Sequence, residues 1–221
     1  EEIIDRMEEN QTHSTSFIEG EMIIRDRFGE RRSTYVMHSE GTDRFIIEFT
    51  SRYEAGQRIL RREGSIYLYY PDAREVIRIQ GAALRDTLLG SDVSYEDMTG
   101  GRGLMEDYHV ALLGQEQLGE FQVYSIKLEA KTSSVPYPMQ IMFIDSESFV
   151  LRKSELYARS GRLLKVNEVL ETMQVDGLIF PSRMRVTDQT RRSQGTEMVI
   201  HHARIGVPLP DQIFSLEELT W

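Results

Sequence analysis

The chain has 221 residues, 40% of them hydrophobic and 28% charged, a composition typical of a folded protein with a packed core. Its 36 acidic and 26 basic residues give a net charge of −10, which argues against nucleic-acid binding, because that role needs lysine and arginine at the phosphates. The absence of cysteine excludes disulfides, thiolate zinc sites and cysteine nucleophiles, and no apolar run approaches the length of a membrane span.

The first ten residues predict a short amphipathic helix. Ile3, Ile4 and Met7 are spaced by three and four residues, which places their side chains on one side of a helix. One apolar side on so short a segment predicts that the helix packs against the rest of the protein.

From residue 17 onward the hydrophobic period changes to two, which predicts β-strands. Phe45, Ile47 and Phe49 share one face of their strand, and Ile77 and Ile79 share one face of theirs. The predicted strands before residue 81 cover 17–25, 33–40, 43–51, 56–63, 65–71 and 74–80.

Residues 81–98 interrupt this series with a segment that predicts helix. Leu84, Leu88 and Leu89 share a face at i, i+4 and i+5, and Gly90 is a natural helix end. The segment 100–103, Gly-Gly-Arg-Gly, follows it, and we interpret it as a hinge because it lacks the lysine and the strand–helix context of a phosphate-binding loop.

Strand patterns then resume at 120–130, 138–145, 148–158, 162–175, 178–189 and 195–205, followed by a proline-containing tail that ends in a helical turn. We expect roughly ten or eleven strands, joined by short turns into a long antiparallel meander. A sheet of this size twists and curls, so its apolar inner face must be covered by other side chains. We expect the two helical segments to pack there.

Two interpretations of the insert at 81–98 stay open. It is either a fixed plug of the core or a lid whose leucines can give way to a lipid chain. Burial of three leucines contributes roughly 5–9 kcal/mol. Ten buried methylenes of a ligand contribute about 8 kcal/mol, which corresponds to roughly micromolar affinity before ordering costs.

The stretch 64–98, GSIYLYYPDAREVIRIQGAALRDTLLGSDVSYEDM, resembles the bacterial outer-membrane lipoprotein-sorting proteins with the LolA/LolB-like fold. The Tyr-Pro turn after a strand, the Gly-Ala-Ala-Leu segment and the Gly-Ser-Asp before Ser94-Tyr95-Glu96-Asp97 carry most of the match. The N-terminal helix and Phe214 after Pro210 also fit the family.

The resemblance implies a mainly β, half-open curved antiparallel barrel whose N-terminal helix and central insert cover an apolar cavity. It implies one domain over residues 1–221 and a periplasmic carrier that shields acyl chains of lipoproteins or lipids, with or without an N-terminal lipid anchor in the outer membrane. Envelope protein partners are a further expectation, and some relatives are regulators. The arginine that holds the lid closed in such carriers matches neither Arg44 nor Arg85 by motif.

Strand parity and the insert together define the predicted ligand-contacting residues of such a cavity. The candidates are Phe45, Ile47, Phe49, Leu68, Tyr70, Ile77 and Ile79 on the strands, with Leu84, Leu88 and Leu89 on the lid. A one-residue bulge in a strand would exchange its inward residues for their neighbours.

Groups that could support chemistry have simpler interpretations. Asp92, Glu96 and Asp97 are expected to cap short helical turns rather than to act as acid, base or cation ligands. His201 and His202 are adjacent on a strand and are expected to point to opposite faces, so no metal site and no cofactor is predicted.

We therefore predict a non-enzymatic lipid or lipoprotein carrier. A lipid-acting hydrolase is the first alternative, since Ser-His-Asp triads are recognised by geometry and not by order in the chain, and it would need a serine or acid beside a histidine in the cavity. An envelope sensor domain is the second, and it would present an exposed apolar patch outside the cavity.

Overall fold

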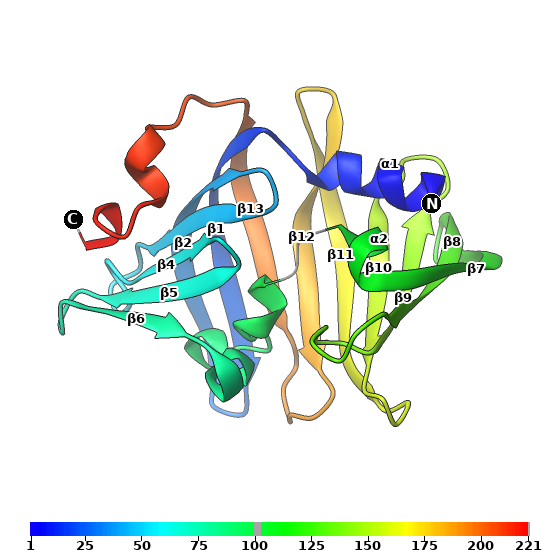
Figure 1. Cartoon of the computed structure of the whole chain (residues 1–221), viewed down its shortest axis with the longest axis horizontal. Coiled ribbons are helices and arrows are strands. Elements are labelled where there is room, and N and C mark those ends of the chain that lie inside the picture. Colours follow the sequence, from blue (N-terminus) through cyan, green and yellow to red (C-terminus); the bar gives the residue numbers. More distant parts are fainter. Residues whose placement is uncertain (100–102, 221) are drawn as a thin grey trace.

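The computed structural model describes residues 1–99 and 103–220, so the predicted hinge residues Gly100, Gly101 and Arg102 lie outside the described part of the chain. Within that part, thirteen strands form a single sheet (Figure 1). The strands are β1 Thr15–Asp26, β2 Gly29–Glu40, β3 Arg44–Phe49, β4 Arg58–Arg62, β5 Ser65–Tyr70, β6 Glu75–Ile79, β7 Tyr108–Leu118, β8 Phe121–Ala130, β9 Met139–Asp145, β10 Leu151–Tyr157, β11 Leu163–Val175, β12 Leu178–Asp188 and β13 Thr196–Ile205.

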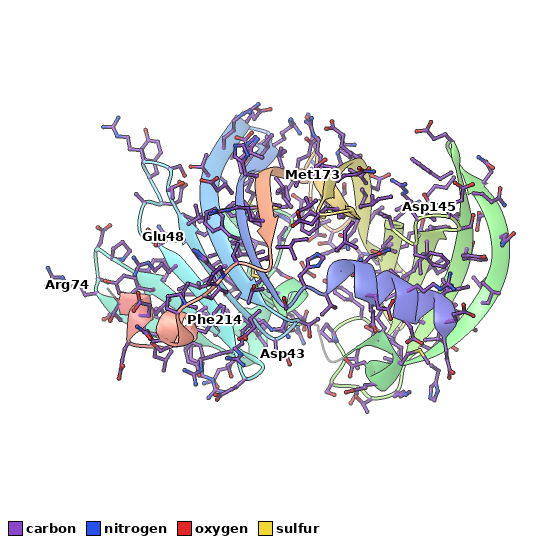
Figure 2. The ribbon with its side chains drawn as sticks, turned by 90° about the horizontal axis from the view of Figure 1, so that it is seen from above. Asp43, Glu48, Arg74, Asp145, Met173 and Phe214 are labelled. Atoms are coloured by element: carbon purple, nitrogen blue, oxygen red, sulfur yellow. The ribbon has the colours of Figure 1, made fainter. Side chains whose placement is uncertain are left out.

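The sheet consists of two antiparallel meanders joined at their first and last strands. The spatial order runs β6-β5-β4-β3-β2-β1-β13-β12-β11-β10-β9-β8-β7. The long pairing of β1 with β13 therefore lies at the centre, and β6 and β7, neighbours along the chain, form the two outer edges. The predicted single meander is wrong in this respect, although the mainly β, curved and open architecture is confirmed (Figure 2).

Strand β7 is the element that the hydrophobic pattern missed. Most of its residues are exposed, including Leu112 and Leu113, because it is an edge strand with only β8 as neighbour. A bulge between Leu112 and Gly114 also shifts its register. Without regular alternation the segment carries no strand signal. The predicted strand ranges correspond to β1–β6 and β8–β13, so β7 is the one strand of the described residues that was missed, and the expected total of ten or eleven was too low.

The insert consists of 3₁₀ turns, not of the predicted α-helix. They are η1 Gly81–Arg85, η2 Leu88–Gly90 and η3 Glu96–Met98, followed by the one-turn helix α2 Leu104–Asp107. Leu89 has a φ of 52°, and Gly90 ends η2 with a φ of 72°, so the chain turns sharply where the prediction continued a helix. Because it connects β6 to β7, the insert crosses from one half of the sheet to the other (Figure 1).

Three apolar clusters hold these parts together. The first joins β1–β5 to the insert, and Ile47 and Leu88 belong to it. The second joins α1, Glu2–Gln11, to β8 and β9 through the fully buried Ile4 and Met7, which confirms the packed face predicted for this helix.

The third cluster places the C-terminal tail on the other face of the first half of the sheet. There Phe214 and Leu219 pack against Ile46, which neighbours Ile47 along β3 and so faces the opposite way. The tail contains the turns η4 Asp211–Phe214 and η5 Glu218–Thr220. No helix within residues 1–99 and 103–220 is long and apolar enough to span a bilayer.

Candidate functional site

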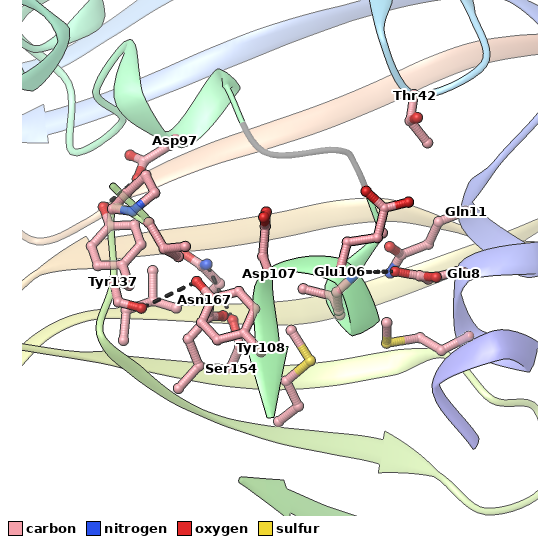
Figure 3. A pocket seen from close by; sticks show the side chains of 18 of the residues that line it. Glu8, Gln11, Thr42, Asp97, Glu106, Asp107, Tyr108, Tyr137, Ser154 and Asn167 are labelled. Carbon is pink, nitrogen blue, oxygen red and sulfur yellow. Dashed lines mark hydrogen bonds between the residues drawn. The ribbon is translucent and has the colours of Figure 1, made fainter. Parts of the chain in front are cut away.

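A cleft of about 980 Å³ lies on the side of the sheet that carries α1 and the insert. Its walls come from α1, the β2–β3 turn, η3, α2, the β8–β9 loop and strands β9, β10 and β11 (Figure 3). This volume lies at the upper end of the roughly 300–1,000 Å³ that ligand pockets occupy. The cleft is therefore large enough for a lipid-sized ligand.

One part of the cleft is apolar. Its lining includes Met7, Leu104, Val135, Met142 and Leu156. Met7 and Met142 belong to the cluster that holds α1 on the sheet, so the same packing that fixes the helix forms this wall. Glu8 of α1 accepts a hydrogen bond of 2.7 Å from the Leu104 backbone amide, which ties α1 to α2 across the opening.

The opposite wall is polar and hydrogen-bonded within itself. The Gln140 side-chain amide donates to the Tyr108 hydroxyl at 2.5 Å, and that hydroxyl donates to the Tyr137 carbonyl oxygen at 3.1 Å. Beside them Asn167 Nδ2 donates to Ser154 Oγ at 3.2 Å across the β10–β11 pair. Burial raises the pKa of Tyr108 and so keeps its hydroxyl proton in place as a donor.

Asp97 of η3 gathers three donors at the edge of this wall. Its carboxylate accepts from the Ser94 amide at 2.8 Å, from the Lys165 ammonium and from the Tyr137 hydroxyl. Burial, followed by the charge of Asp97, raises the pKa of Tyr137, which therefore stays protonated. Burial also raises the pKa of the neighbouring Glu96 carboxyl. The contact with Ser94 is local but is not a side-chain cap of η3, and the contacts with Lys165 and Tyr137 join the insert to β11 and to the β8–β9 loop.

Arginines from outside the insert donate to its backbone carbonyls. Arg31 bonds to Leu89 at 2.7 Å, Arg191 bonds to Gly90 at 2.9 Å and to the next residue, and Arg61 bonds to Thr99 at 2.9 Å. From the sequence, these three arginines belong to short basic runs that are expected to be solvated; their contacts with the insert were not predicted, because the partners are main-chain atoms remote along the chain.

Asp92 fixes the insert from the inside. It is 1% exposed, and its carboxylate accepts from the Asp188 amide at 2.8 Å and from the hydroxyls of Ser193 and Thr196. The expected role as a helix cap is therefore wrong for Asp92, because its acceptors are used by the β12–β13 connection, far away in sequence.

The predicted cavity residues meet in one cluster, with one exception. Phe45, Ile47, Phe49, Leu68, Tyr70, Ile79, Leu84, Leu88 and Leu89 all belong to the cluster between the first half of the sheet and the insert. Ile77 stands apart and is 42% exposed on the edge strand β6. Side chains of the cluster itself fill most of this space and leave a cavity of only about 220 Å³ below the insert. Contact of these residues with a ligand stays a prediction.

The sequence did contain a signal for the polar wall. Ser154 and Leu156 alternate on β10, and Lys165 and Asn167, their cross-strand partners, alternate on β11. Polar residues at inward positions of two adjacent strands indicate a polar cavity wall. The positions of Tyr137 and Asp97 in the polar wall could not be predicted from alternation, because neither residue lies on a β-strand.

The two adjacent histidines lie differently from the prediction. A bulge of the β1–β13 pair falls at His201, and both His201 and His202 line one surface groove instead of pointing to opposite faces. Among residues 1–99 and 103–220, no group of three or more histidine and carboxylate side chains could hold a metal ion.

Comparisons with solved structures identify the fold. A DUF1329 family protein from Desulfovibrio piger superposes with a TM-score of 0.90 at 22% identity, over 99% of this chain and 96% of that one. A domain named for outer membrane lipoprotein sorting, from Vibrio parahaemolyticus, gives 0.89 at 21%, over 100% and 97%. A LolA superfamily protein from Nitrosomonas europaea gives 0.77 at 24%, over 98% and 97%.

The resemblance to the lipoprotein-sorting proteins is thus confirmed for the fold. No curated protein matches the chain in sequence. A family model described as "Uncharacterized protein" matches residues 41–221, which is most of the chain. The protein therefore belongs to the family that this model describes, and its fold is that of the LolA superfamily.

Proposed function

We propose that this protein is a carrier or receptor of the bacterial envelope that binds the acyl chains of lipids or lipoproteins. The cleft of about 980 Å³ beneath α1 and α2 is the observation that carries the proposal. Its apolar wall, formed by residues such as Met142 and Leu156, offers the surface that a hydrocarbon chain needs. A periplasmic location belongs to this proposal and is supported by the fold shared with lipoprotein-sorting proteins.

The energy of chain burial is sufficient for such a role without any charged anchor. At about 0.8 kcal/mol per methylene, ten methylenes contribute roughly 8 kcal/mol before ordering costs. We infer that a chain enters the open cleft, because the space under the insert is already filled by leucine and aromatic side chains.

We propose further that the protein acts without catalysis. The nearest approach to a nucleophile with a base in this region is Ser94 Oγ, which lies 3.2 Å from Lys165 Nζ. In this contact Lys165 Nζ is the donor and the serine oxygen is the acceptor, and the same nitrogen is ion-paired with Asp97, so the pair is not arranged for the lysine to act as a base toward the serine. No histidine occurs among the described residues that line the cleft, which supports a carrier over a hydrolase.

Native mass spectrometry with lipid extraction, on protein purified from a bacterial envelope fraction, tests the proposal. We expect co-purifying acyl species in the wild-type protein. Leu104→Gln places a polar group in the apolar wall and should reduce their amount several-fold. Leu216→Gln in the tail is the matched control, since Leu216 is 40% exposed and lies outside the cleft. An empty wild-type protein that also binds no uncharged hydrophobic probe would contradict the carrier role.

A second candidate function is a partner-binding sensor domain of the envelope. Leu112 and Leu113 on the edge strand β7 are 58% and 56% exposed, and they lie outside the cleft. Exposed leucines on an unpaired edge favour contact with another protein. The experiment above separates the two candidates, because a sensor of this kind needs no bound chain.

A further inference from the structure

The segment that links α1 to β1 carries a histidine with a buried ring nitrogen. Residues 12–14 run across one end of the sheet from α1 to β1 (Figure 1). The His13 ring stacks on Phe180 of β12, with 5.5 Å between the ring centroids and 29° between the ring planes. Its Nε2 atom is buried, and no hydrogen-bond partner among residues 1–99 and 103–220 reaches it. The ring is therefore held by stacking and not by a polar contact of this nitrogen.

The stack lies where two neighbouring strands have stopped pairing. In the described chain, β12 and β13 share four residue pairs, from Arg183–Val199 to Val186–Thr196, and Phe180 lies beyond the last of them. His13 bridges this end of the sheet. Its ring contacts β12, and its backbone carbonyl oxygen accepts a hydrogen bond of 3.0 Å from the amide of Gly41 in the β2–β3 turn.

The residues around His13 form part of the lining of the cleft. Gln11 and Thr12, which precede it in the chain, line the cleft, and so do Gly41 and Thr42 of the β2–β3 turn. Because His13 is joined to the first pair by the chain and to Gly41 by a hydrogen bond, a movement of its ring away from β12 displaces two parts of the lining together.

The His13 ring fits this place in its neutral form. A neutral imidazole has one N–H, whereas the protonated ring has an N–H at both nitrogens. The charged ring would thus carry a buried Nε2–H that has no acceptor among the described residues, which costs free energy. Burial accordingly lowers the pKa of His13 from its ordinary value of 6.5.

Charged side chains on the adjoining elements do not offset this effect. The lowered pKa of His13 has burial as its cause, with no contribution from a neighbouring charge. The charged residues of the last turn of α1, of the β2–β3 turn and of β12 are Glu8, Glu9, Glu40, Asp43, Arg44, Arg183, Arg185 and Asp188. A proton on the stacked ring therefore gains no stabilising partner.

We propose that His13 makes the cleft acid-sensitive: the neutral ring holds the α1–β1 segment on β12, and protonation displaces the ring from Phe180, loosens the lining and releases the bound chain. The displaced ring binds a proton more readily than the stacked ring. The stacked state is therefore fully stable above about pH 6.5 and loses stability as the pH falls below that value. This role of His13 rests on the proposed function and adds its regulation by pH.

An NMR titration of the ligand-free protein from pH 7.5 to 4.5 tests the contact itself. We expect the His13 ring protons to titrate below pH 6.5. The amide of Gly41, which donates to the His13 carbonyl oxygen, should shift with the same midpoint. Titration of the ring without any response of Gly41 would overturn the proposed coupling between His13 and the lining of the cleft.

Binding of the uncharged fluorescent probe N-phenyl-1-naphthylamine at pH 7.5 and pH 5.0 tests the effect on the cleft. We expect the wild-type affinity to be roughly threefold or more lower at pH 5.0, since protonation shifts the population away from the stacked state. His13→Phe keeps a ring that stacks on Phe180 but binds no proton, so its affinity should be the same at both pH values. His109→Phe, on the exposed edge strand β7, is the matched control and should retain the wild-type pH dependence.

Glu96 is the competing source of pH dependence. It lines the cleft, and burial raises the pKa of its carboxyl group. Glu96→Gln should keep the loss of probe affinity in acid if His13 is responsible. Loss of the pH dependence in Glu96→Gln, together with its persistence in His13→Phe, would place the switch at Glu96 and overturn the role of His13.

The outcomes separate the pH switch from the carrier role. Equal probe affinity of the wild-type protein at both pH values would overturn the switch and leave the carrier role standing. Absence of probe binding at pH 7.5 would contradict the carrier role, and the Gly41 titration would then still judge the His13 contact. If His13→Phe does not fold, that titration of the wild-type protein remains the deciding measurement.

Discussion

A single carboxylate on the face opposite the cleft organises the centre of the sheet. Glu197 of β13 is 2% exposed and lies within 2.9 Å of guanidinium nitrogens of Arg25, Arg183 and Arg185, from β1 and β12. Burial alone would raise its pKa, but hydrogen bonds from Arg185 and Arg183 and the charge of Arg25 outweigh burial and lower the pKa to about 2. Glu197 therefore connects the two meanders where β1 meets β13.

This network predicts a specific loss of stability in acid. A folded-state pKa below the ordinary value of 4.5 means that Glu197 stabilises the fold fully above about pH 4.5 and loses this effect as the pH falls toward 2. The full contribution is about 3 kcal/mol. Urea unfolding at pH 7 and pH 3 should show a smaller pH-dependent loss in Glu197→Gln than in the wild type. Glu129→Gln, whose side chain is 61% exposed and is paired with Lys127, outside the Glu197 network, is the control, and equal pH dependence in all three proteins would refute the assignment.

Among the elements, the insert depends on packing more than on helical propensity. Leu88 is 3% exposed and belongs to the cluster with β1–β5, while its neighbours Leu84 and Leu89 are only partly buried. Leu88→Ala should therefore lower the free energy of unfolding by about 3 kcal/mol, the usual cost of a buried leucine truncation with an unfilled cavity. Leu112→Ala on the exposed edge of β7 is the matched control, with an expected change below about 0.5 kcal/mol.

Loss of less than about 1 kcal/mol in Leu88→Ala would contradict this account of the insert as a packed element. Chemical denaturation followed by circular dichroism provides both values. A fluorescent-probe titration of the same variant adds a functional reading, since truncation enlarges the cavity of about 220 Å³ below the insert.

The elements also mark what local sequence can predict. Strand β3, whose Phe45, Ile47 and Phe49 all belong to the first cluster, and the N-terminal helix followed from their patterns, because each presents a regular apolar face to the core. Strand β7 did not, since an edge strand with exposed leucines has no buried face to impose a period. The predicted helix that would align Leu84, Leu88 and Leu89 on one face does not form, because the chain turns at Leu89. Packing of the insert on the sheet outweighs helix propensity there.

For the whole molecule, the decisive contacts join residues far apart in sequence. The β1–β13 pairing, the bonds of Asp92 to the β12–β13 connection and the Lys165–Asp97 pair all do so. No local period encodes such partners, so the sequence could indicate a curved sheet with a covered face but not where the open cleft would lie. The structure separates two regions, a first half filled by the insert and a second half that keeps the cleft.

This division predicts how the molecule responds to a bound chain. Hydrogen exchange with and without a saturating dodecyl amphiphile should show added protection in α1 and α2, which cover the cleft. Amides of the insert such as Leu88, which donates to Val93 at 2.8 Å, should keep their protection, because Arg31, Arg191 and Asp92 hold the insert in place. Phe28→Ala, at an exposed hairpin tip, is the control for unspecific amphiphile binding.

Faster exchange across residues 84–95 on binding would contradict this expectation. It would mean that the insert yields to the chain, and it would support ligand contact by Phe49, Leu68 and the other members of the cluster beneath it. The size of the change in exchange rate is informative as well. Full release of the insert must overcome both the burial of Leu88 and the arginine contacts. A chain that only fills the cleft therefore cannot release the insert.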